Sequence, residues 1–130
     1  MKSINRCLLI DDNELDQTLY RRIFRRSGMV GEIISFTMAE EALEYLSDPE
    51  TPQIDAIFLD INMPRMNGFE FLEAAQPLLR ERFKAVVIVM LTTSLAPEDL
   101  DRAENFGVVN DYFHKPLSIE HLERVASYLP

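Results

Sequence analysis

The chain has 130 residues, which suits one domain, and 47% of them are hydrophobic, which is enough to build a sizeable core. Its formal net charge of −9 disfavours direct binding to nucleic acid, because a basic surface supplies most of the non-specific affinity of such binding. The single cysteine, Cys7, excludes an internal disulfide, and no apolar run reaches the ~18 residues of a membrane span. The N-terminus also lacks the pattern of a secretory signal, so we expect a cytoplasmic protein.

The first half of the chain alternates apolar and amphipathic segments. Residues 7–10 and 32–36 predict strands, and Cys7 in the first of them is expected to be an inert, buried thiol. The helix predicted between these strands carries an apolar residue at every fourth position, and we expect this stripe to face the core: Leu15, Leu19 and Ile23. In the second predicted helix, Thr37 and Glu40 have the spacing of a capping box.

The second half of the chain continues this alternation. Apolar runs predict three more strands, at 56–59, 86–91 and 112–113. Three more helices are predicted, and they begin after Asn67-Gly68, near Pro97 and near Ser118. Pro77 should end or kink the first of these helices, because proline lacks the amide hydrogen and crowds the preceding turn.

Three of the predicted strands are unbroken apolar runs rather than alternating ones, which indicates that helices cover both faces of a parallel sheet. Because crossovers between parallel strands are right-handed, few topologies remain. We expect an α/β fold in which a doubly wound, five-stranded parallel sheet has the flavodoxin-like order 2-1-3-4-5. The sequence has neither an internal repeat nor a linker, so a single domain should span residues 1–130.

Polar residues follow four of the predicted strands, at the carboxyl edge where ligands bind in sheets of this kind. They are Asp11 and Asp12, Asp60, Thr92 and Lys115. Alone, each would be more typical of a turn, a helix cap or a solvated surface, but their common edge favours a site. Three crowded carboxylates repel one another unless a cation intervenes, and Mg²⁺, with Mn²⁺ as an alternative, suits their oxygen ligands. Lys115 and Thr92 would then stabilise a phosphoryl group in transfer to Asp60.

Four segments of the sequence resemble the signature blocks of bacterial response-regulator receiver domains of the CheY-like type. They are LIDDNE at 9–14, LDINMPRMNG at 59–68, MLTTS at 90–94 and YFHKP at 112–116. The block at 59–68 is highly specific, and the blocks together span nearly the whole chain. The resemblance implies a stand-alone receiver of a two-component system or phosphorelay. Such a receiver accepts a phosphoryl group, here on Asp60, from a histidine kinase or a histidine phosphotransfer protein.

The resemblance also implies the ligands of the Mg²⁺ ion. Asp12 would bind the ion directly and Asp11 mainly through water. Asp60 and the backbone carbonyl of Asn62 would complete the set of protein ligands. The Asn62 side chain would in addition tune how long the phosphate survives.

The resemblance assigns further residues to the phosphoryl group and to a switch. Lys115 would pair with Asp60 and then with a phosphoryl oxygen. Thr92 would turn toward the phosphoryl group, and Tyr112 would change rotamer in step with it. Ser94 would help to tune the lifetime of the phosphate.

Some details of the last third of the chain need separate expectations. The peptide bond before Pro116 would be cis, as the resemblance implies. The segment 107–115 is one residue longer than is common in the family, so we expect a bulge in the fifth strand. Thr93 competes with Thr92 for the switch role, but its side chain should face the other way if the strand continues.

The expected output is binding to a partner protein. The chain ends about one helix after Pro116, so we expect no output domain within it, and a monomer or a weak dimer. By resemblance, phosphorylation would reshape the face of the fourth helix, fifth strand and fifth helix, around Tyr112 and around His121 on the outer side of the fifth helix. Four arginines of the first helix form either a solvated face or a docking edge for the kinase: Arg21, Arg22, Arg25 and Arg26.

Three other functions stay open. An aspartyl phosphatase or phosphotransferase would need an acid or base two residues after Asp60, where Asn62 stands, so we expect no enzyme beyond its own phosphorylation and dephosphorylation. A flavin-binding module would need a phosphate-cradling loop where the acidic segment 11–14 stands. A receiver-like scaffold that is never phosphorylated is disfavoured because no essential residue is missing.

Overall fold

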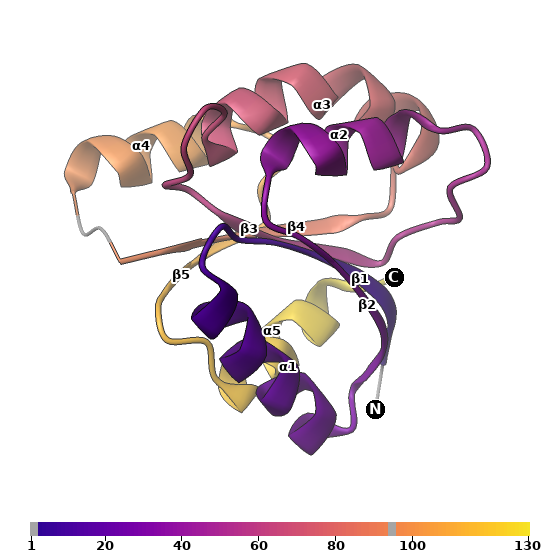
Figure 1. The fold of residues 1–130 in the computed structure, drawn as a ribbon, viewed down its shortest axis with the longest axis vertical. Coiled ribbons are helices and arrows are strands. Elements are labelled where there is room, and N and C mark those ends of the chain that lie inside the picture. The colour runs from indigo at the N-terminus through magenta and orange to yellow at the C-terminus, as the bar shows by residue number, and fades with distance from the viewer. Residues whose placement is uncertain (1–2, 94–95) are drawn as a thin grey trace.

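The computed structural model describes residues 3–93 and 96–130, and five strands alternate with five helices along them. In chain order the elements are β1 (Ile4–Ile10), α1 (Glu14–Ser27), β2 (Val30–Phe36), α2 (Ala39–Ser47), β3 (Ala56–Asp60), α3 (Gly68–Arg82), β4 (Val87–Thr92), α4 (Pro97–Asn105), β5 (Asp111–His114) and α5 (Ile119–Tyr128). All neighbouring strands pair in parallel, and their order β2-β1-β3-β4-β5 confirms the predicted topology. Helices α1 and α5 cover one face of the sheet, and α2, α3 and α4 cover the other (Figure 1).

Each face of the sheet has its own hydrophobic core, because successive strand residues point to opposite faces. Leu8 and Ile57 pack toward α2 and α3, whereas Leu9 and Phe58 pack toward α1 and α5. Cys7 is buried in the second core, and burial raises the pKa of its thiol to about 12, as expected of an inert cysteine. Among the described residues, none of the helices combines the length and the apolar character needed to cross a bilayer.

Helix α1 buries a different face from the one that the sequence predicted. Leu15 is 69% exposed and Leu19 is 43% exposed, while Gln17, Tyr20 and Phe24 are buried. Two interactions select this face. The Phe24 ring packs against Phe58 with 5.1 Å between ring centroids. The Gln17 amide nitrogen donates to two backbone carbonyls, one of Asp11 at 2.8 Å and one of Phe36 at 2.9 Å.

The predicted cap of α2 is wrong, and so is one of the two outcomes predicted for Pro77 in α3, an end of the helix at that residue. The N-cap of α2 is Met38, whose side chain makes no capping hydrogen bond, so the capping box predicted from Thr37 and Glu40 is wrong. Helix α3 does not end at Pro77 but continues to Arg82. Pro77 lies on the exposed side of the helix, where a carbonyl that loses its amide partner can be hydrated, while buried side chains of the same helix hold its other face to the core.

Strand β5 is not bulged, contrary to the prediction. Its residues pair one to one with β4, from Val89 with Asp111 to Thr92 with His114. Asn110, the residue just before the strand, also pairs with β4. The Asn110 amide donates to the Ile88 carbonyl at 2.7 Å, and the Asn110 side-chain oxygen accepts from the Ile88 amide at 2.9 Å.

Candidate functional site

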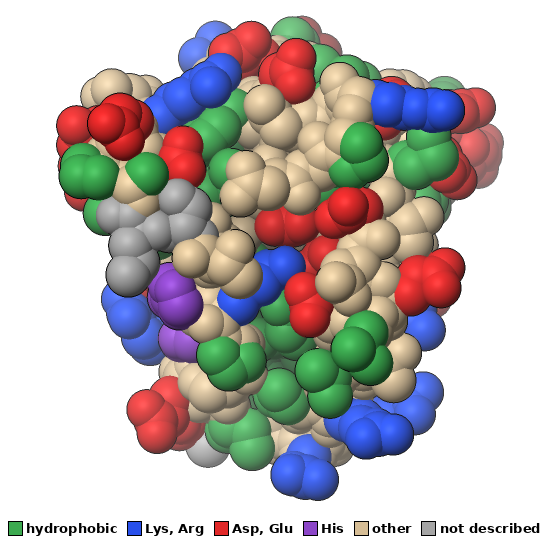
Figure 2. All heavy atoms as spheres, turned by 60° about the vertical axis from the view of Figure 1, so that its left-hand side comes forward, with side chains coloured by type: hydrophobic (Ala, Val, Ile, Leu, Met, Phe, Trp, Pro, Cys, Tyr) green, Lys and Arg blue, Asp and Glu red, His purple; other side chains and the backbone are tan. Residues whose placement is uncertain are grey.

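The carboxyl edge of the sheet brings together three carboxylates. Oxygen atoms of Asp11, Asp12 and Asp60 all lie within 4.8 Å of one another. Asp11 and Asp60 are buried and Asp12 is exposed. In the space-filling view, acidic side chains lie above and to the right of a basic one near the middle of this surface (Figure 2). The sequence prediction that these strand ends meet at one edge is therefore confirmed.

Local backbone geometry positions these carboxylates. The Asn13 amide donates to Asp11 Oδ1 at 2.9 Å, and the Asn13 side chain then caps α1 by accepting from the Asp16 amide at 3.0 Å. On the other side of the site, the start of α3 comes very close to the end of β3. A Cβ atom at Gly68 would lie 2.6 Å from the Asp60 carbonyl oxygen, so only glycine fits there.

The electrostatics of this edge favour a cation. Burial, and next the charge of Asp11, raise the pKa of Asp60 from 3.8 to about 7, although Lys115 and the Asn62 amide act in the opposite direction. The pKa of Asp11 is also raised, again mainly by burial. A divalent ion with oxygen ligands would remove this repulsion, and clustered carboxylates are the donors that Mg²⁺ prefers. The residues present therefore fit a magnesium site.

Lys115 reaches into this acidic cluster. Its Nζ atom lies 2.9 Å from Asp11 Oδ2, 3.0 Å from Asp16 Oδ2 and 3.5 Å from Asp60 Oδ1. Burial lowers the pKa of the Lys115 ammonium, but the three carboxylates outweigh this and raise it above its ordinary value. The peptide bond between Lys115 and Pro116 is cis, as the resemblance implied.

Asp16 is the site residue that sequence reasoning missed. A signal for it exists, because Asp16 stands in the first turn of the helix that directly follows the acidic pair. This places its side chain at the same edge of the sheet as the strand ends. The sequence pattern of this helix indicated an apolar stripe and a basic face, but no residue of the site.

The predicted switch residues lie next to each other at the ends of β4 and β5. Thr92 is fully buried, and its side chain is a hydrogen-bonding partner of the half-buried Tyr112 phenol. Thr93 is exposed, in agreement with the expectation that it faces away from Thr92. The backbone amide of Asn62 faces the Asp60 carboxylate and acts to lower its pKa. Ser94 lies outside the described residues.

His121 does not lie on the outer side of α5 as predicted. It is half-buried, and its ring stacks on Phe113 with 4.2 Å between ring centroids and 11° between ring planes. Its Nδ1 atom accepts a hydrogen bond from the Ser118 amide at 3.1 Å, so the imidazole completes the N-terminal cap of α5. The sequence pattern did not indicate this role, because the reciprocal position of a capping box is usually Glu or Gln.

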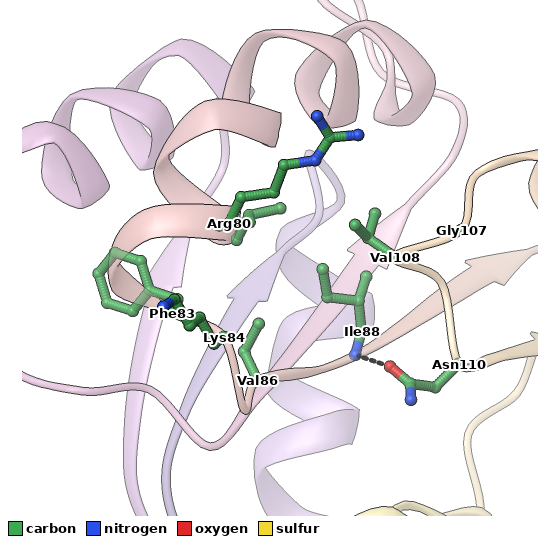
Figure 3. Close-up of a pocket in the computed structure, with 9 residues that line it drawn as sticks. Arg80, Phe83, Lys84, Val86, Ile88, Gly107, Val108 and Asn110 are labelled. Carbon is green, nitrogen blue, oxygen red and sulfur yellow. Dashed lines mark hydrogen bonds between the residues drawn. The ribbon is translucent and has the colours of Figure 1, made fainter.

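Two of the concave regions of the described surface lie at opposite edges of the sheet. A groove of about 620 Å³ lies beside Lys115, and its lining includes Leu19, Ile23 and Arg22 of α1. A separate cavity of about 310 Å³ lies near the start of β4 and is lined in part by Arg80 (Figure 3). Asp and Glu are absent from the described residues that line this second cavity, so of these two regions the first is the one that adjoins the acidic cluster.

Comparisons with known proteins agree with this geometry. The family model of the response regulator receiver domain matches residues 7–127. The probable methanogenesis regulatory protein FilR2 of Methanothrix harundinacea is 38% identical over 122 residues, which are 90% of this chain and 76% of that protein. Other curated relatives are longer, and the chain spans between 6% and 57% of their length.

Solved structures share the fold. A two-component response regulator of Cytophaga hutchinsonii superposes with a TM-score of 0.84 and 30% identity, over 97% of this chain and 96% of that one. The receiver domain of the sensor histidine kinase PA1611 of Pseudomonas aeruginosa superposes with a TM-score of 0.78 at 24% identity, over 98% of each chain. That structure has a magnesium ion coordinated in its active site cleft.

Proposed function

This chain belongs to the response regulator receiver domain family of two-component signalling, and from that premise we propose that it accepts a phosphoryl group on Asp60 in a Mg²⁺-dependent reaction. One observation carries the proposal: the buried Asp60 carboxylate lies beside both an acidic pair and the Lys115 ammonium. Receiver domains interact with histidine kinases and phosphotransfer proteins, so we propose one of these as the phosphodonor.

The proposed reaction starts at a carboxylate oxygen of Asp60. This oxygen attacks the phosphorus atom, the bond from phosphorus to the donor imidazole nitrogen breaks, and the leaving imidazole takes up one proton. Asp12, Asp60, the Asn62 carbonyl and, through water, Asp11 would hold Mg²⁺, which supplies positive charge for the phosphoryl oxygens and favours the ionised, nucleophilic form of Asp60. The backbone amide of Asn62, which favours the ionised form of Asp60, would help to orient that carboxylate for attack.

Lys115 and Thr92 would stabilise the product. The Lys115 ammonium is close enough to donate to a phosphoryl oxygen on Asp60 after a small shift. A Thr92 hydroxyl that turns toward the phosphoryl group would leave its present partner, the Tyr112 phenol. This exchange would link phosphorylation to the face of α4, β5 and α5, through which we propose that the signal passes to a downstream protein.

The groove beside Lys115 is the proposed docking place of the phosphodonor. It adjoins Lys115, and the apolar side chains of Leu19 and Ile23 line it together with Arg22 and Arg26. Leu19 is exposed and Ile23 is half-buried, and apolar side chains at a concave surface are typical of protein contacts. Of the two interpretations of the arginine face, this arrangement favours the docking edge.

The test is intact-protein mass spectrometry after incubation with acetyl phosphate. We expect one phosphoryl adduct in the presence of Mg²⁺, none after chelation, and none in Asp60→Asn. Asp101→Asn, which removes an exposed carboxylate of α4, is the matched control and should keep the adduct. An adduct that persists in Asp60→Asn contradicts the proposal. Rapid, repeated turnover of acetyl phosphate would instead favour the phosphatase alternative.

A further inference from the structure

The Lys115 ammonium is held by two carboxylates that do not accept the phosphoryl group. An ammonium has three N–H donors, and the 2.9 and 3.0 Å contacts with Asp11 and Asp16 are hydrogen bonds that use two of them. The 3.5 Å contact with Asp60 is longer than an ordinary charge-assisted hydrogen bond. Lys115 is therefore held back from the residue that it must serve after phosphorylation.

The N-terminal cap of α1 explains why Asp16 is available for this contact. Asp16 is the third residue of the helix after the cap Asn13, the position from which a Glu or Gln side chain accepts the cap residue's amide hydrogen in a capping box. Here Asp11 Oδ1 already accepts that hydrogen from Asn13. The Asp16 carboxylate is thus released from capping and reaches Lys115 instead.

We propose that Asp16 is a positioning residue that competes with Asp60 for the Lys115 ammonium and thereby weakens the affinity of the site for a phosphoryl group. The inference rests on the proposed function of Asp60. Asp16 lies outside the cluster of carboxylates that could bind the metal, so metal binding leaves it free to hold Lys115.

The sign of the effect follows from what remains when Asp16 is neutralised. The fully buried Asp11 still anchors Lys115, so the ammonium keeps its place near Asp60. One competing acceptor is lost, and so is one negative charge beside the position of the incoming anion. Both changes favour the bound phosphoryl group. Because the Asp16 side chain is 28% exposed, solvent screening keeps the effect moderate.

The experiment measures the affinity for beryllofluoride, which mimics the phosphoryl group, by calorimetric titration in the presence of Mg²⁺. We expect Asp16→Asn to bind about threefold to fivefold more tightly than wild type. Asp16→Ala should change the affinity in the same direction. Asp16→Glu keeps a carboxylate, so its affinity for beryllofluoride should lie within about twofold of that of wild type. The half-life of phospho-Asp60 should lengthen in Asp16→Asn to a similar extent.

Glu14→Gln is the matched control. It removes the same charge from the same helical turn, but Glu14 is exposed and is not among the carboxylates that contact Lys115. Its affinity should stay within about twofold of wild type. Melting temperatures of all variants identify any that fold poorly, and the alanine and asparagine variants serve as replacements for each other.

The outcomes separate the two proposals. If wild type does not bind beryllofluoride, the proposed function of Asp60 fails. If wild type binds but Asp16→Asn binds equally well or more weakly, the competition by Asp16 is overturned while the proposed function stands. The competition is also overturned if Glu14→Gln binds beryllofluoride as tightly as Asp16→Asn does, or if the affinity of Asp16→Glu stays as high as that of Asp16→Asn. The effect would then be a general one of charge or helix structure.

Discussion

The two edges of the sheet differ in how their polar groups are satisfied. At the carboxyl edge, buried carboxylates and one ammonium group leave a surplus of negative charge. At the amino edge, the Arg82 guanidinium donates to four backbone carbonyls at the end of α2 and in the segment that leads into β3: those of Leu46, Asp48, Pro49 and Thr51. The amino edge satisfies its own polar groups and serves stability. The carboxyl edge stays electrostatically incomplete, as a site for a cation and an anion requires.

The largest effect on stability should come from Lys115→Ala. This change leaves buried carboxylates without their cation, and the free energy of unfolding at pH 8 without Mg²⁺ should fall by about 3–5 kcal/mol. Mg²⁺ should restore part of the loss. Urea unfolding measures both values. Lys84→Ala, at an exposed lysine of the amino edge, is the control, and equal stability of the two variants would contradict the comparison.

The pH dependence of stability should reflect the buried Asp60 carboxylate at the carboxyl edge. The pKa of Asp60 is raised from 3.8 to about 7, so the folded chain holds this proton more tightly than the unfolded chain. The resulting stability is complete below the unfolded pKa and is lost as pH rises through the folded pKa. Without Mg²⁺, the free energy of unfolding should therefore decrease from pH 5 to pH 8.

Asp60→Asn should flatten this decrease, and Asp101→Asn should not. Urea unfolding at the two pH values tests the expectation. Mg²⁺ should oppose the decrease, because the ion favours the ionised carboxylate. A decrease of the same size in Asp60→Asn would assign the effect to other groups.

A smaller loss is expected at the amino edge from Arg82→Met. The methionine keeps much of the apolar stem but removes the hydrogen bonds to the segment before β3, so the free energy of unfolding should fall by about 1–3 kcal/mol. Beryllofluoride affinity should not change, because the affected carbonyls lie at the other edge. A changed affinity would mean that the two edges are coupled.

The smallest effect is expected from Leu15→Ser. Since Leu15 is 69% exposed, the free energy of unfolding should change by less than about 0.5 kcal/mol. Phosphoryl transfer from the cognate kinase should slow if α1 is the docking edge, whereas transfer from acetyl phosphate should not. A large loss of stability would instead mean that Leu15 faces the core, as the sequence predicted.

The sequence predicted the carboxyl edge better than it predicted the helix faces. Buried parallel strands read as apolar runs, so the polar residue after each run marks the edge directly, as with Asp60 after 56–59. Helix α1 carries two candidate stripes, one through Leu19 and one through Tyr20 and Phe24. Which stripe is buried depends on Phe58, a residue of another element that periodicity does not report.

The contact between Asp16 and Lys115 could not be predicted for a related reason. It depends on Asp11 taking the capping hydrogen of Asn13, and on a pairing between residues 99 positions apart. The one-to-one register of β5 was missed similarly. There, a side-chain carbonyl of Asn110 stands in for a backbone group, and spacing alone cannot distinguish the two.

The Gln17 amide has a mechanical consequence for α1. Its nitrogen donates to two carbonyls at the ends of adjacent strands, that of Asp11 just after β1 and that of Phe36 at the end of β2. A rotation of α1 about its own axis would therefore break both hydrogen bonds, and with them the contact to the ends of β1 and β2. A protein that binds the outer side of α1 and rotates the helix would therefore also displace the loop that carries the acidic pair.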